Sequence, residues 1–71
     1  MSTQPEVAEI LRELIEELGT EIDLHYEDEQ LPAAIPAMMR MEKAVAWLES
    51  HGENVPTIYK HLLTRFARIS H

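Results

Sequence analysis

The charges of this chain are sorted by position, and this sorting constrains the fold more than any other feature of the sequence. Residues 1–29 carry ten acidic side chains and one arginine, Arg12, whereas residues 54–71 carry three lysine or arginine side chains and no acidic one. Because opposite charges attract, the two ends should pack against each other, or against the opposite ends of a second copy. The sorting therefore favours folds that bring the two ends of the chain together.

The chain has only 71 residues, so we expect a single domain, residues 1–71. A domain of this size buries only about 60 per cent of the surface that its unfolded chain exposes, which makes the core marginal. The sequence holds no cysteine, so neither a disulfide nor a thiolate zinc site can add stability. Association is the remaining common source of stability. We therefore expect a homodimer, with another protein as an alternative partner.

Apolar residues recur at helical spacing in the first part of the chain. The residues of this stripe are Val7, Leu11, Leu14 and Leu18. Glutamates occupy another face of the same segment, which makes it amphipathic. The pattern predicts a helix over about residues 4–18, begun by a capping box of Thr3 and Glu6 and ended by Gly19.

Residues 20–33 form a connection whose structure the sequence leaves open. Polar and apolar side chains alternate over residues 21–27, which is typical of a half-buried strand. A lone strand needs a partner, so a real strand would have to pair across a dimer axis. Alternatively, Thr20 caps a short helix. We favour a short helix or an irregular segment.

Two further helices follow. Helical spacing of apolar residues predicts the second over residues 34–51, and Gly52 should end it. Asn54 is a suitable N-cap for the third, predicted over residues 55–69 with apolar and basic side chains on opposite arcs. The fold class is therefore all-α: a small antiparallel helical hairpin or three-helix bundle, completed by a second chain into a dimeric helical bundle.

Several large apolar side chains of the second and third helices are candidates for an interface. Methionines make adaptable binding surfaces, and tryptophan is enriched at interaction hot spots. The same side chains could instead fill the core. The candidate interface residues are Ile35, Met38, Met39, Met41, Val45, Trp47, Tyr59 and Phe66.

The sequence carries no recognisable catalytic or metal-binding motif. Its four histidines lie among many carboxylates, but none follows a glutamate by three residues and no two are four apart. Those are the spacings of di-iron bundles and helical zinc pairs. No nucleophile motif or glycine-rich phosphate loop is present either. We therefore expect a protein that is not an enzyme and that uses no cofactor or metal.

A helix-turn-helix module over residues 44–68 is an alternative. Residues 55–62 resemble the recognition helix of tetracycline-repressor-family regulators, which often read Thr-Ile-Tyr followed by a basic residue and His, although the family pattern is longer before the threonine. The resemblance implies DNA contacts by Thr57, Tyr59, Lys60 and His61. A net charge of −7 argues against binding to nucleic acid or to anionic membranes.

These observations favour a small acidic module, without catalysis, that binds another protein or a second copy. A further alternative is that the acidic front half mimics nucleic-acid phosphates and occupies a basic partner. No secretory signal opens the chain, and no apolar run approaches about 18 residues, so we expect a soluble, cytoplasmic protein.

Overall fold

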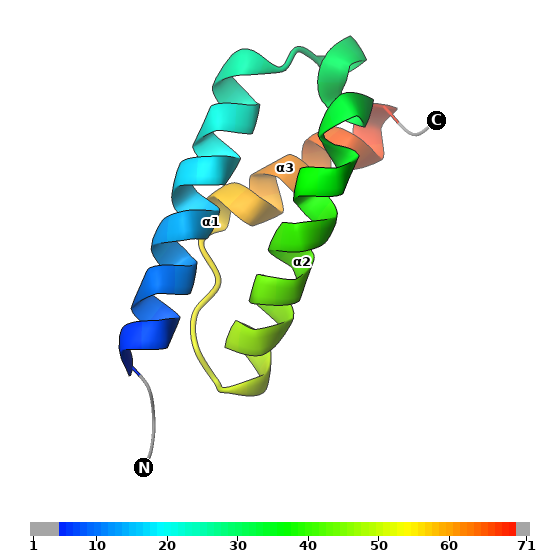
Figure 1. Ribbon diagram of the computed structural model, residues 1–71. Coiled ribbons are helices and arrows are strands. Elements are labelled where there is room, and N and C mark those ends of the chain that lie inside the picture. The colour runs from blue at the N-terminus through cyan, green and yellow to red at the C-terminus, as the bar shows by residue number, and fades with distance from the viewer. Residues whose placement is uncertain (1–4, 70–71) are drawn as a thin grey trace.

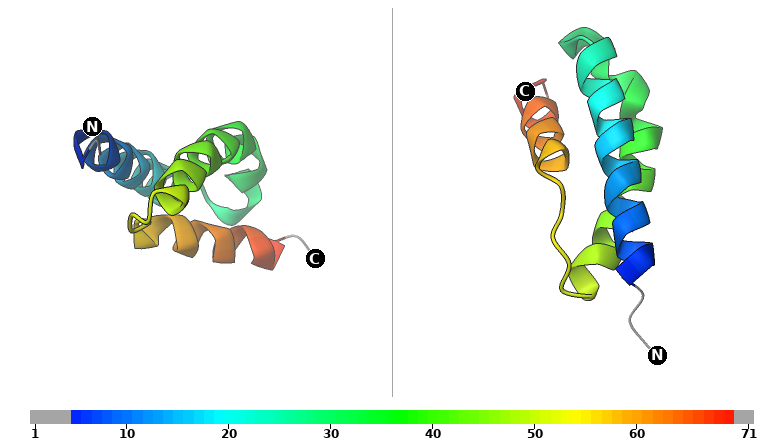
Figure 2. Two further views of the ribbon diagram at one scale, coloured as in Figure 1. Left: turned by 90° about the horizontal axis from the view of Figure 1, so that it is seen from below. Right: turned by 90° about the vertical axis from the view of Figure 1, so that its left-hand side faces the viewer.

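Two antiparallel helices form one layer of the structure, and a third helix packs across one side of them (Figures 1 and 2). The computed structural model describes residues 5–69. Its elements are α1 (Pro5–His25), a 3-10 helix η1 (Asp28–Ala34), α2 (Ile35–Ser50) and α3 (Thr57–Ile69). The all-α prediction is confirmed, since the described residues form helices and no strands. Thr3 of the predicted capping box lies outside the described residues.

The prediction that Gly19 ends the first helix is wrong, because α1 continues for two more turns to His25. Gly19 is buried and packs against α3. A Cβ atom added at Gly19 would lie 2.9 Å from Cγ2 of Ile58. Glycine at this position therefore allows α1 and α3 to approach each other closely, and it does not end the helix.

Replacing Gly19 with alanine tests this contact. We expect Gly19→Ala to lower the free energy of unfolding by about 1 kcal/mol, because overpacking costs about 2 kcal/mol and the better helix propensity of alanine returns about 1. When Ile58 is also replaced with alanine, the added Cβ no longer meets Ile58. Gly19→Ala should then raise the free energy of unfolding by about 1 kcal/mol through helix propensity alone. Urea denaturation of the four proteins in this double-mutant cycle measures both effects. Stabilisation by Gly19→Ala alone would show that the helices are not in tight contact.

The ambiguous connection consists of the last turns of α1 followed by η1. Ile22 is buried in the helix, so the polar and apolar alternation of residues 21–27 is not a strand, and Thr20 does not start a new helix. The Gln30 side chain accepts a hydrogen bond from the Glu27 backbone N–H at 2.8 Å, which begins η1. The chain thereby reverses direction and enters α2.

The second helix has the predicted extent to within one residue at each end. Gly52 follows it with φ of +71°, a left-handed conformation in which glycine carries no steric penalty, so the prediction that Gly52 stops this helix is confirmed. The third helix begins two residues later than predicted, at Thr57. Asn54 is therefore not its N-cap. Instead, residues 53–56 form a non-helical connection from α2 to the start of α3 (Figure 1).

The core lies where the three helices and η1 meet. From α1 it receives Ala8, Ile15 and Ile22, which are seven residues apart and therefore share one face. The other buried apolar residues are Leu31 and Ala34 of η1, Met38, Met41, Val45 and Leu48 of α2, and Tyr59 and Leu62 of α3. Both α2 and α3 pack against α1, and η1 packs against α2 and α3.

Candidate interaction surface

An open apolar groove lies between α1 and α2. It has a volume of about 800 Å³, and its lining residues all belong to these two helices. Figure 2 shows α3 packed across one side of the α1–α2 pair, and no residue of α3 lines the groove, so α3 leaves it uncovered. Its apolar lining residues are Leu11, Leu14 and Leu18 of α1 and Met41 and Ala44 of α2.

Large apolar side chains are exposed along α1, both on the wall of the groove, at Leu14 and Leu18, and just beyond it, at Ile10. Leu14 is 56% exposed and Ile10 is 54% exposed, and Leu18 is also exposed. These three residues are spaced four apart, so they form one stripe along the helix. Singly scattered apolar residues are normal on a surface, but a continuous stripe beside a groove marks a site of interaction.

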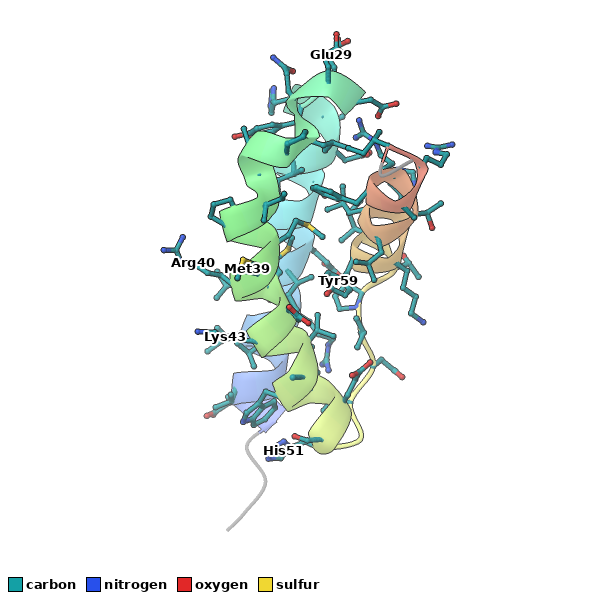
Figure 3. The ribbon with its side chains drawn as sticks, turned by 90° about the vertical axis from the view of Figure 1, so that its right-hand side faces the viewer. Glu29, Met39, Arg40, Lys43, His51 and Tyr59 are labelled. Carbon is teal, nitrogen blue, oxygen red and sulfur yellow. The ribbon has the colours of Figure 1, made fainter. Side chains whose placement is uncertain are left out.

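Charged side chains of opposite sign stand on the two walls of the groove. The α1 wall carries Glu16, Glu17 and Glu21, and the α2 wall carries Arg40. Lys43 is exposed three residues after Arg40. Figure 3 shows both basic side chains pointing to the side away from α3. The groove thus has an acidic wall, an apolar floor and a basic wall.

Four of the eight candidate interface residues lie inside the chain itself. Met38, Met41, Val45 and Tyr59 belong to the core, although Met41 also reaches the groove floor. The physical reason is that α2 directs its most regular apolar stripe at α1 and α3. We therefore correct the candidate interface by removing Met38, Val45 and Tyr59 from it.

The other four candidates are exposed or half-buried, but they lie away from the groove. Ile35 and Met39 are exposed on α2, and Phe66 is half-buried beside the core. Trp47 is half-buried, and its ring stacks on the imidazole of His51 with ring centroids 3.8 Å apart and an interplanar angle of 15°. None of these four residues lines the groove.

Sequence reasoning missed the exposed stripe of α1. It placed Leu14 and Leu18 in the apolar stripe of the first helix but not among the candidate interface residues, whereas the structure exposes them and buries Ala8, Ile15 and Ile22. A usable signal was present, because apolar residues on α1 cover more of the helix circumference than one neighbouring helix can bury. Such a wide apolar face predicts a second contact surface.

The sorted charges meet within the single chain at Arg65. Its guanidinium donates hydrogen bonds to Asp23 Oδ1 at 2.9 Å, to Asp28 Oδ1 at 2.8 Å and to the backbone carbonyl of Tyr26 at 2.9 Å. The hydrogen bond to Asp28 is the largest cause that raises the pKa of Arg65. The predicted attraction between the acidic front and the basic back is confirmed here, between the C-terminal end of α1 and α3.

Several groups that the helix-turn-helix reading needs are occupied inside the fold. Tyr59 is buried, and burial raises the pKa of its phenol, with the carboxylates of Glu42 and Glu49 raising it further. His61 Nε2 lies 3.0 Å from Asp23 Oδ1. Arg65, a further basic residue of this module, is engaged in hydrogen bonds as well. Of the four residues that the resemblance implies as DNA contacts, Thr57 and Lys60 are exposed and are not engaged in this way.

Within residues 5–69, no three histidine, aspartate or glutamate side chains are grouped closely enough to hold a metal ion. No helix in this part of the chain combines the length and the apolar character needed to cross a membrane. Comparison with protein families, with curated proteins and with solved structures finds no match to the chain. The geometry of the groove is therefore the main guide to function.

Proposed function

We propose that this chain is a small non-catalytic protein–protein interaction module and that the α1–α2 groove is its binding surface. The observation that carries this proposal is the exposed stripe of Ile10, Leu14 and Leu18 beside a groove that α3 leaves uncovered. Fully burying an exposed side chain of this type is worth about 1.5 to 3 kcal/mol, and because these three are 38% to 56% exposed, about half of that remains available from each on binding. Covering the stripe is therefore a substantial driving force for association.

The shape of the groove suits an amphipathic helix as the bound element. From Ile10 to Leu18 the stripe extends about 12 Å along α1, since a helix rises about 1.5 Å per residue. A partner helix with apolar residues at spacings of three and four would place about three anchors over this length. The charged walls would then contact the polar edges of that helix and fix its orientation.

Site-specific photo-crosslinking in the cells that make the protein tests this proposal. A photoreactive benzoylphenylalanine replaces Leu14, in the groove, or Glu13, which is exposed one residue away and does not line the groove. We expect a protein adduct from position 14 and little or none from position 13. Matching thermal melts of the two proteins control for damage to the fold. Absence of any protein adduct at position 14, or equal yields at both positions, would contradict the proposal.

A further inference from the structure

We propose that the occupant of the groove is a second copy of this chain, related to the first by a two-fold axis parallel to α1 and α2. This inference rests on the proposed function of the groove. In this arrangement α1 of each copy packs on α2 of the other. The four helices form an antiparallel bundle, and the two α3 helices lie on its outer sides.

The groove is self-complementary in its apolar surface. A two-fold axis makes both copies use the same patch, so every contact occurs twice. Each copy contributes the exposed stripe containing Leu14 from α1 and, from α2, the half-buried Ala44, with the buried Met41 beneath it. The chain measures 45 × 21 × 18 Å, so the face opposite α3 is large enough for an interface of about 800 Å² per partner.

The charges select the orientation of the axis. A two-fold axis perpendicular to the helices would place α1 on α1, and within Pro5–His25 Arg12 is the sole lysine or arginine among seven acidic side chains. Like charges facing each other would oppose that packing. The parallel axis avoids this repulsion, because it places the acidic wall of each copy beside the basic wall of the other.

The charged residues also lie within one stretch of the helix pair. Glu17, Glu21 and Arg40 line the same groove within one copy. The α1 residues of that groove, Leu11 to Glu21, span about 15 Å, so all three charges fall within a common level of about that length. A two-fold axis parallel to the helices preserves that level. Each copy therefore sets Glu17 and Glu21 beside Arg40 of the second copy, at two symmetric junctions.

Charge reversal followed by mixing tests the arrangement. Sedimentation velocity over a range of concentrations should show that the unmodified chain dimerises. Arg40→Glu and Glu21→Arg should each weaken self-association by about tenfold or more, because like charges then meet at both junctions. An equimolar mixture of the two variants should form a heterodimer, because each junction then joins opposite charges. Glu13→Arg, which makes the same charge change away from the groove, is the matched control and should dimerise normally.

Each other outcome overturns a defined part of the inference. A wild-type dimer whose two variants do not recover on mixing excludes the parallel two-fold axis. A wild-type monomer that still gives an adduct with a different protein from position 14 overturns the second copy as the occupant but leaves the proposed function in place. A monomer that gives no adduct from position 14 overturns both.

Discussion

Replacing Leu62 with alanine is expected to lower the free energy of unfolding by about 3 kcal/mol, within the range of about 2 to 5 kcal/mol for a buried leucine. Leu62 is 0% exposed and lies in the core on α3. A domain of this length has a total stability of about 4 to 10 kcal/mol. The single change should therefore remove a large fraction of the stability, which urea denaturation followed by circular dichroism will measure.

The neighbouring residue provides a matched control for this experiment. Leu63 is the same residue type one position along the same helix, but it is 46% exposed. Leu63→Ala should cost less than about 1 kcal/mol, because water already covers much of the side chain. Equal effects of the two changes would mean that α3 does not pack on the face described here. A larger effect at Leu63 would mean that the helix is rotated.

Some elements could be predicted because local sequence determines them. The second helix and its end are examples, since a regular apolar stripe runs up to Gly52 and the glycine then adopts a left-handed conformation. Gly19 could not be interpreted in the same way. A glycine after an apolar stripe can end a helix or admit a neighbouring helix. The residue that decides between these roles, Ile58, lies far away in the sequence.

The face of α1 that becomes buried could not be predicted from spacing either. Leu11, Leu14 and Leu18 have helical spacing, and so do Ala8, Ile15 and Ile22. Which stripe enters the core depends on where η1 directs α2 and where α3 crosses the pair. The groove is the consequence of that choice, because the stripe containing Leu14 remains uncovered.

The charge pattern predicted that the chain ends would attract, but it could not identify the arginine involved. Lys60, Arg65 and Arg68 share one segment, and the acidic side chains are spread over many positions. Arg65 of α3 is the residue that binds the C-terminal end of α1, because α1 extends to His25. The location of these contacts therefore depends on the last turns of α1, which the interpretation of Gly19 as a helix end did not predict.

Replacing Arg65 with methionine is expected to lower the free energy of unfolding by about 2 kcal/mol. The Arg65 side chain is 11% exposed, and it donates to the backbone carbonyls of Asp23 and Tyr26 at the C-terminal end of α1. A cation at that position also interacts favourably with the helix dipole. Asp28 is 58% exposed, so its ion pair contributes little in water. Most of the loss should therefore come from Asp23 and the two carbonyls.

Two further variants separate geometry from charge in this cluster. Arg65→Lys keeps the positive charge, but a lysine ammonium has three donors and cannot reproduce the fork that holds Asp23, Asp28 and the Tyr26 carbonyl. We expect it to lose more than half of the effect of Arg65→Met in urea denaturation. Arg68→Met, on the exposed side of α3, should change stability by less than about 0.5 kcal/mol. Full retention of stability by Arg65→Lys would instead mean that charge alone joins α3 to the end of α1.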